Sequence, residues 1–163
     1  MKRIKSDKII FADQLFDGYV YFDNGIITDV TQKEIPVFKE YDLTGYYVSA
    51  GFIDIHTHGG GGNRFEGSVD EIVDGCNFHL MYGTTSICPT ISAAALDSMA
   101  QSVENVRKAM NDPRVKGTII GAHLEGPYLS RKQSGAQCAD FISDPNEQEY
   151  LPLLERYGDT IAR

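Results

Sequence analysis

The sequence predicts a mixed α/β fold in two parts, and three observations support this prediction. Residues 1–50 carry short strand-like runs separated by turns, and residues 51–163 alternate strand-like with helix-like segments. Two of the later strand-like segments end in side chains that can bind a metal. Alternating strands and helices joined by short loops are typical of a parallel sheet. With 42% hydrophobic and 23% charged residues, the 163-residue chain can form an ordinary folded core.

The first part, residues 1–50, is expected to contain several short strands. Residues 23–25 read Asp-Asn-Gly between two apolar runs, which is a strong signal for a hairpin turn. The piece is too short to bury both faces of a sheet, so we expect it to form part of a small β-sandwich domain. In order, the strand candidates are residues 8–11, 18–22, 26–30, 37–38 and 46–48.

Strands and helices alternate from residue 51 onward. A capping box, Ser68 with Glu71 three residues later, opens a helical pattern that Gly83 closes. Residues 96–110 show a second helical spacing, which stops at Pro113. The strand candidates of this part are residues 51–58, 84–90 and 117–124, and a third helix is expected to open at Asp144-Pro145.

Three strand–helix units fit either an open doubly wound sheet or the first three units of a (β/α)8 TIM barrel. The glycine run at residues 59–62 lacks the register of a dinucleotide-binding loop and is expected to be a flexible loop. We prefer the barrel, because barrels place their chemistry at the C-terminal ends of several strands. Residues 51–163 would then be the first three βα units of a hydrolase barrel, a fold that typically needs about 250 residues.

Two histidines close the strand candidate at residues 51–58. Side chains in a strand alternate between faces, so His56 and His58 project from the same face. Glu125 ends a second apolar segment, where an unpaired carboxylate would carry a large desolvation cost. Imidazole and carboxylate together suit a divalent metal, with Zn²⁺ or Fe²⁺ as candidates. The alternatives are two hydrogen-bonded histidines at a strand end, and an ion pair between Glu125 and a basic residue.

Other polar residues near these segments have less specific patterns. His123 points the same way as the carboxylate but lies deeper, so it is expected to be a core histidine or a partner of a ligand. Asp54 could support a ligand or be a hydrogen-bonded structural residue. His79 lies in a helical pattern and is expected to be structural. Arg131 and Lys132 could meet an anionic group, although an exposed basic pair is the simpler interpretation.

Charge and cysteine content narrow the class of protein. The formal net charge of −8 argues against nucleic acid or an anionic membrane surface as a partner. The start of the chain lacks the apolar run of a signal peptide, and no segment approaches the roughly 18 apolar residues of a membrane span. Three cysteines without a C-x-x-C spacing indicate reduced thiols, so we expect a cytoplasmic protein.

The motifs of this chain resemble those of the N-acetylglucosamine-6-phosphate deacetylases, a family of the amidohydrolase superfamily. The strand with two histidines indicates only the superfamily, whereas the run His-Leu-Glu-Gly-Pro is far more specific. The resemblance implies a complete barrel with a small β-sandwich built from both chain ends. It also implies metal-dependent hydrolysis of the acetamide of N-acetylglucosamine 6-phosphate to glucosamine 6-phosphate and acetate. The matching segments, in the family's order, are residues 48–59, 83–90, 121–128 and 135–136.

The resemblance also implies roles for individual residues. Glu125 would be the principal metal ligand, and His56 and His58 would bind at a second metal position that only some members possess, giving one or two ions. Ala136, through its backbone, and Gln137, where many relatives carry histidine, would contact the sugar. The general base and two further histidine ligands come from later strands in the family, so no catalytic residue is expected within this chain. On the same ground the barrel of residues 51–163 would be truncated at Arg163, with an open sheet edge. Family members hold the phosphate partly with a neighbouring subunit, which implies a homodimer.

Two other functions fit the same residues. Another amidohydrolase, of the cyclic amidase type, would share the two-histidine strand, although the run His-Leu-Glu-Gly-Pro speaks against it. If the 163 residues are the complete protein, the chain would instead be a non-enzymatic metal-binding module that is well folded and monodisperse.

Overall fold

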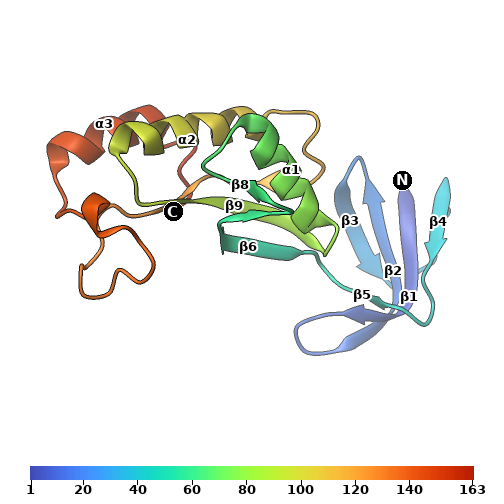
Figure 1. Ribbon diagram of the computed structural model, residues 1–163. Coiled ribbons are helices and arrows are strands. Elements are labelled where there is room, and N and C mark those ends of the chain that lie inside the picture. The colour runs from blue at the N-terminus through green and yellow to red at the C-terminus, as the bar shows by residue number, and fades with distance from the viewer. The chain divides into compact units, whose positions relative to one another are not determined.

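The computed structural model describes residues 1–163 and divides into two compact units (Figure 1). The first unit consists of five strands. The strands of this unit, Met1–Ala50, are β1 (Lys2–Ile10), β2 (Leu15–Asp23), β3 (Ile26–Thr31), β4 (Lys39–Asp42) and β5 (Tyr47–Val48). They pair in the order β3-β2-β1-β4, and β5 also pairs with β1. The first three strands are antiparallel neighbours, whereas β4 and β5 run parallel to β1.

The predicted hairpin joins β2 to β3. Asn24 and Gly25 have positive φ angles of 48° and 81°, as a two-residue turn between twisted strands requires. Asp23 pairs directly with Ile26, so the turn also fixes the register of the two strands.

One of the five strand predictions for this unit is wrong by two positions, because β4 follows residues 37–38 instead of including them. All four residues of β4 are exposed, so no buried apolar face marks the strand in the sequence. Ion pairs help to hold β4 in place. The buried Arg3 of β1 forms one with Glu40 of β4 and another with Glu34, in the segment between β3 and β4. The other four strand candidates fall on β1, β2, β3 and β5.

The first unit leaves part of its apolar surface uncovered. It contains an apolar pocket of about 400 Å³, whose lining includes Ile4, Ile10 and Phe22. Ile27, which lines this pocket, is largely exposed, and so is Phe38, which directly precedes β4. The unit thus does not bury both faces of its sheet by itself.

The second unit, Gly51–Arg163, contains a parallel sheet covered by helices. Its strands are β6 (Phe52–Thr57), β7 (Gly59–Gly60), β8 (Asn63–Arg64), β9 (Thr84–Ser92), β10 (Thr118–Ile119) and β11 (His123–Glu125). Its helices are α1 (Val69–Leu80), α2 (Leu96–Met110) and α3 (Glu147–Tyr157), with a short 3-10 turn at Ala139–Phe141.

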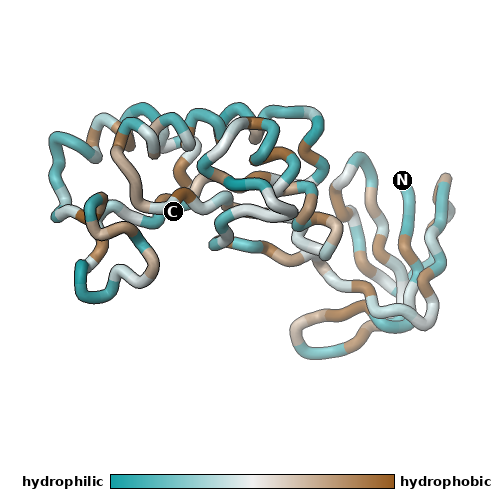
Figure 2. The backbone as a smooth tube through the Cα atoms, in the orientation of Figure 1, coloured by the Kyte–Doolittle hydropathy of each residue, from teal (hydrophilic) through white to brown (hydrophobic).

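Strand β9 is the centre of this unit. It pairs in parallel with β6 along one edge and with β10 and β11 along the other. Helices α1 and α2 pack on the sheet and α3 packs beside α2 (Figure 1). Along α1 and α2 the colour in Figure 2 alternates between hydrophilic and hydrophobic, because one side of each helix faces the core. The fully buried side chains of this core include Phe65, Ile72, Ile91, Met99 and Val103.

The first two helices of this unit lie where the sequence predicts them, but the C-cap of α1 is Met81, and Gly83, with φ 98°, lies two residues beyond it. Ser68 caps α1: its side chain accepts the backbone N–H of Glu71, and the Glu71 carboxylate accepts the backbone N–H of Ser68 at 2.8 Å. Helix α2 ends at Met110, just before the expected stop at residues 111–113.

The predicted strand at residues 117–124 is divided into β10 and β11. Gly121 lies between them with φ 154°, a backbone conformation that side chains rarely adopt. A Cβ atom at Gly121 would lie 2.5 Å from the carbonyl oxygen of Thr160. The break therefore gives room for the C-terminal segment, where Ile161 forms a parallel bridge with Ala122.

The third helix begins later than predicted. Asn146 is the N-cap of α3, and its side chain accepts the N–H of Gln148 at 3.1 Å. Pro145 thus lies outside the helix, and a different proline, Pro152, lies inside it. The start of the helix is set by the amide cap of Asn146, which the sequence analysis did not consider, and not by the proline.

The glycine run is not the flexible loop that the sequence suggested. It forms the hairpin β7–β8, in which Gly61 and Gly62 have φ angles of 61° and 86°. Nε2 of His79 in α1 lies 2.9 Å from the carbonyl oxygen of Gly59, so this histidine anchors the hairpin to the helix.

Strand β6 has a hydrogen-bonded neighbour on one edge only. Its Phe52 and Ile53 side chains are each 67% exposed, and Ile55 is 50% exposed. None of the helices combines the length and the apolar character that crossing a bilayer requires.

We expect Ser68→Ala to lower the free energy of unfolding by about 1 kcal/mol, because it removes the side-chain cap of α1. Chemical denaturation of the protein expressed from its complete reading frame would measure the change. Ser98→Ala, at an exposed serine inside α2, is the matched control and should change stability by less than about 0.5 kcal/mol. Equal effects of the two substitutions would contradict the role of the cap.

Candidate metal site

Three side chains that can bind a metal meet at the C-terminal ends of the parallel strands. His56 belongs to β6, His58 follows just after that strand ends, and Glu125 is the last residue of β11. One ligand atom of each lies within 4.8 Å of the others. The fold thus brings together the three residues that the sequence singled out as candidate ligands.

The two imidazoles point the same nitrogen at one carboxylate oxygen. Nε2 of His58 lies 2.9 Å from Oε2 of Glu125, and Nε2 of His56 lies 3.9 Å from that oxygen. The rings are nearly perpendicular, with an interplanar angle of 84°. The two histidine side chains are 44% and 41% exposed and the glutamate 28%, so solvent can reach the cluster. Two imidazoles and a carboxylate are a donor set that can hold a zinc or iron ion and leave positions for water.

The backbone beneath the histidines is held by side chains. Pairing of β6 with β9 is irregular between Asp54 and Thr57, where β6 has one residue more than β9. The Asp54 carboxylate accepts the backbone N–H of His56 at 3.0 Å, and Thr57 donates its N–H to Oγ1 of Thr90 at 2.9 Å. Asp54 therefore fixes the main chain at His56 through the backbone N–H.

His123 forms a wall of the site and is outside the three-residue cluster. It is buried, and its ring centroid lies 4.9 Å from that of His56. Nδ1 of His123 lies 3.0 Å from the carbonyl oxygen of Ile55 and 3.4 Å from Oγ1 of Thr90. Burial lowers the pKa of His123 below its usual value, which favours the neutral ring that donates to Ile55. The structure thus places His123 as a support beside a candidate ligand.

Gln137 reaches the cluster from the loop that follows β11. Its Nε2 donates to Oε2 of Glu125 at 2.7 Å, and its Oε1 accepts the backbone N–H of Ala93 at 2.9 Å. The amide therefore clamps the candidate ligand to the end of β9. Ala136, the other residue expected to contact a substrate, is exposed beside it.

Ser92 and Glu66 belong to the site, and the sequence interpretation missed both. Oγ of Ser92 lies 3.1 Å from Nδ1 of His58 and 2.9 Å from Oε1 of Glu66. Ser92 could have been noticed, because it ends the apolar run of β9 as Glu125 ends that of β11. Glu66 lies between β8 and α1, where no periodic pattern marks its position.

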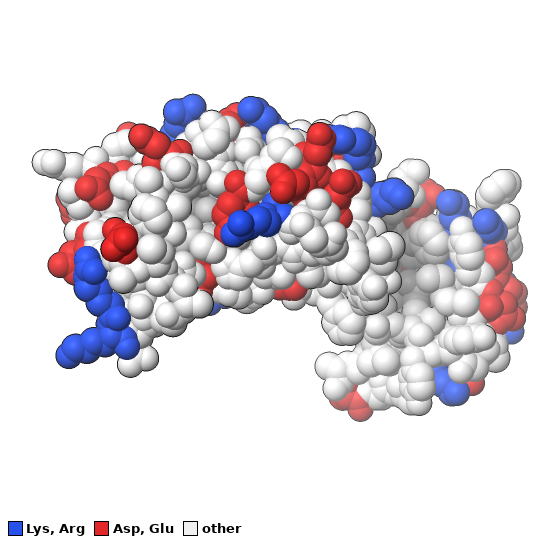
Figure 3. All heavy atoms as spheres, in the orientation of Figure 1, with Lys and Arg blue, Asp and Glu red and all other residues white.

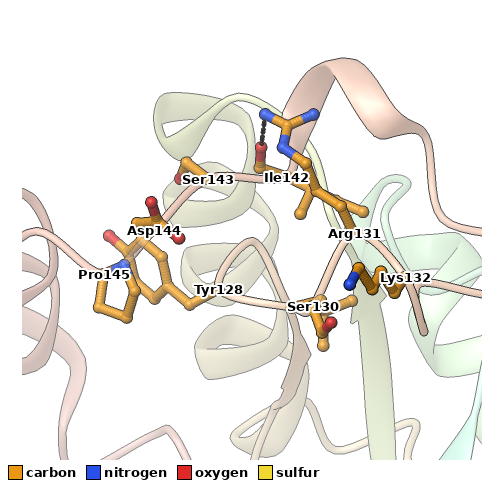
Figure 4. Close-up of a pocket in the computed structure, with 9 residues that line it drawn as sticks. Tyr128, Ser130, Arg131, Lys132, Ile142, Ser143, Asp144 and Pro145 are labelled. Atoms are coloured by element: carbon orange, nitrogen blue, oxygen red, sulfur yellow. Dashed lines mark hydrogen bonds between the residues drawn. The ribbon is translucent and has the colours of Figure 1, made fainter.

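Arg131 and Lys132 line a separate pocket of about 600 Å³ in the loop after β11 (Figure 4). The Arg131 guanidinium donates to the carbonyl oxygens of Ala139 at 3.1 Å and Ile142 at 2.6 Å, the second of which is drawn in Figure 4. Arg131 therefore links the start of this loop to its later part. None of the three candidate ligands lines this pocket.

A sequence model of the amidohydrolase family matches residues 47–162. The match includes the parallel sheet, its helices and all three members of the cluster. The chain belongs to the amidohydrolase family. That family is metal-dependent, and the side-chain cluster at the strand ends fits this property.

Within this family, the chain is similar to deacetylases of phosphorylated amino sugars. The chain is 32% identical over 155 residues to N-acetylglucosamine-6-phosphate deacetylase of Haemophilus influenzae. This match covers 93% of this chain and 40% of the relative. It is 33% identical over 147 residues to N-acetylgalactosamine-6-phosphate deacetylase of a Shewanella strain, covering 89% and 36%. The crystal structure of N-acetylglucosamine-6-phosphate deacetylase from Pasteurella multocida has the same mixed α/β fold, with a TM-score of 0.86 and 27% identity over 98% of this chain and 43% of that one. The chain spans between 29% and 42% of the length of the curated relatives it matches.

We expect the three cysteines to differ sharply in reactivity. Cys138, next to Gln137, is exposed, whereas Cys76 and Cys88 are buried. Burial raises the pKa of the Cys76 thiol to about 12 and also raises that of Cys88, so few thiolates form at neutral pH. A thiol reagent followed by mass spectrometry should label Cys138 at least about 100-fold faster than the other two. Fast labelling that persists in Cys138→Ser would contradict this order.

Proposed function

We propose that this chain supplies the first part of a metal-dependent deacetylase that hydrolyses N-acetylglucosamine 6-phosphate to glucosamine 6-phosphate and acetate. The observation that carries the proposal is the meeting of His56, His58 and Glu125 at the ends of two parallel strands. The names of the relatives give the substrate class, a phosphorylated amino sugar.

The proposed architecture is a (β/α)8 barrel with a small β-sandwich domain. Residues 51–163 would contribute the first three βα units, and residues 1–50 would contribute strands of the sandwich. Two features support this proposal: β6 is unpaired along one edge, and the first unit has an open apolar pocket. Later segments of a longer chain would cover both surfaces.

The proposed site binds one or two divalent ions, with zinc or iron favoured by the donor set. Glu125 would hold the principal ion, and His56 and His58 would complete a second position beside it. A bound ion lowers the pKa of water and polarises an amide carbonyl. The family resemblance implies a general base on a later strand of the complete protein, and we propose that the base lies there.

The chain's own residues would prepare this site. Gln137 keeps Oε2 of Glu125 in place, and His123 closes the side of the site behind His56. Ala136, through its backbone, and Gln137 would lie beside the bound sugar. The loop that carries them is tied together by Arg131.

The proposed partners follow from charge as well as from the relatives. Acidic and basic side chains are intermixed on the face in Figure 3, and the net charge is −8. This balance favours a small phosphorylated sugar over nucleic acid or a membrane surface. We further propose a cytoplasmic homodimer for the complete enzyme.

Acetate release from N-acetylglucosamine 6-phosphate by the protein expressed from its complete reading frame tests the reaction. We expect activity that a chelator removes and a divalent metal restores, and a loss of more than about 100-fold in kcat/KM for Glu125→Gln, because the principal ligand is weakened. Glu155→Gln, at an exposed glutamate of α3, is the control and should leave both activity and metal content unchanged.

Three outcomes of that assay would contradict parts of the proposal. Hydrolysis of the N-acetylgalactosamine epimer alone would keep the reaction class and overturn the substrate. Hydrolysis of a cyclic amide instead would favour another type of amidohydrolase. Metal binding by a stable protein that hydrolyses none of these compounds would favour the non-enzymatic module.

A further inference from the structure

Ser92 lies at the junction of a chain of hydrogen bonds that leads away from the candidate metal site. It is the last residue of β9, directly opposite Glu125 of β11 in the parallel register. Its hydroxyl is 3.1 Å from Nδ1 of His58 and 2.9 Å from Oε1 of Glu66. The backbone N–H of Ser92 donates to the same Oε1 at 3.1 Å.

The direction of these hydrogen bonds follows from the groups involved. Oε1 of Glu66 accepts the backbone N–H of Ser92 and is therefore also the acceptor for the Ser92 hydroxyl proton. A hydroxyl has one proton, so its oxygen can only accept from His58. Nδ1 of His58 must then carry a proton, and in the neutral ring Nε2 is left with a free lone pair.

That free lone pair faces Glu125. Nε2 of His58 is 2.9 Å from Oε2 of the carboxylate, so in the neutral ring two electron-rich atoms point at each other. A cation bound by both atoms would remove this repulsion, so the two atoms are placed as two ligands of one ion would be. The hydrogen bonds on the Nδ1 side thus determine which nitrogen is offered to a metal.

Glu66 is well placed to hold this orientation. Its own carbonyl oxygen lies 3.4 Å from the hydroxyl of Ser102, and Asn105 donates to the carbonyl oxygen of Gly67 at 2.9 Å. The preceding residue, Phe65, is fully buried in the core. Helix α2 and the core therefore fix the main chain on both sides of Glu66.

We propose that Glu66 is a positioning residue that acts through the hydroxyl of Ser92 to keep the proton of His58 on Nδ1 and to present Nε2 to the metal. This inference rests on the proposed metal site. Without the Glu66 carboxylate the Ser92 hydroxyl can rotate and donate to Nδ1. The proton of the ring then moves to Nε2, where it bonds Glu125 and blocks coordination.

Zinc titration of the metal-free protein, expressed from its complete reading frame, against a chelating dye is the first test. We expect Glu66→Ala and Ser92→Ala to weaken zinc binding by about 10–100-fold. Ser92→Thr keeps the hydroxyl and should restore binding to within about threefold of wild type. Glu155→Gln should bind as wild type does.

Nitrogen NMR of histidine-labelled protein is the second test, and a change in stability alone does not affect it. In the metal-free wild type, the neutral His58 ring should carry its proton on Nδ1. Ser92→Ala should show the Nε2–H form or a mixture, and Ser92→Thr should return to Nδ1–H. If Glu66→Ala does not fold, Ser92→Ala and Ser92→Thr together are sufficient for both tests.

The outcomes separate this inference from the proposed function. A wild-type protein that binds zinc, and loses it in His58→Ala but not in Glu66→Ala or Ser92→Ala, would overturn the positioning role and keep the metal site. An unchanged tautomer in Ser92→Ala would overturn it as well. A wild type that binds no zinc would overturn the proposed metal site, whatever the tautomer shows.

Discussion

Parallel pairing along both edges of β9 is the constraint on which the candidate site depends. Because β6 and β11 run in the same direction on opposite sides of β9, their C-terminal ends meet at one edge of the sheet. This arrangement brings two histidines from one strand within reach of a glutamate from the other. Helices α1 and α2 cover the apolar side chains of β9 and β10, whereas β6 is held to β9 by strand pairing and adds no residue to this core.

The candidate ligands are held by neighbours that act on different atoms. Asp54 fixes the backbone of His56, the Ser92 hydroxyl meets the ring of His58, and the Gln137 amide holds the Glu125 carboxylate. Asp54 and Ser92 leave Nε2 of the two rings free, whereas Gln137 bonds Oε2 of Glu125, the oxygen that faces the histidines and that keeps a second lone pair. Ligands held in this way lose little conformational freedom on binding, which is the usual reason for such supporting contacts around metals.

The parts of the structure that the sequence predicted are those with a local physical signal. Helices α1 and α2 follow from their apolar spacing, and Ser68 follows from its capping box. The candidate ligands could be found because polar side chains closing apolar strands are costly unless they bind something. The split at Gly121 could not, since its cause is the C-terminal segment that comes close in space. Glu66 was missed for the same reason: it meets Ser92 only through the fold.

The most direct test of this account is a crystal structure of the zinc-loaded protein, expressed from its complete reading frame, with anomalous scattering recorded at the zinc edge. The account predicts an ion at about 2.0–2.3 Å from a carboxylate oxygen of Glu125, with histidine coordination through Nε2 of His56 or His58. Zinc bound elsewhere while these three side chains stay free of metal, or bound through Nδ1 of either histidine, would contradict it.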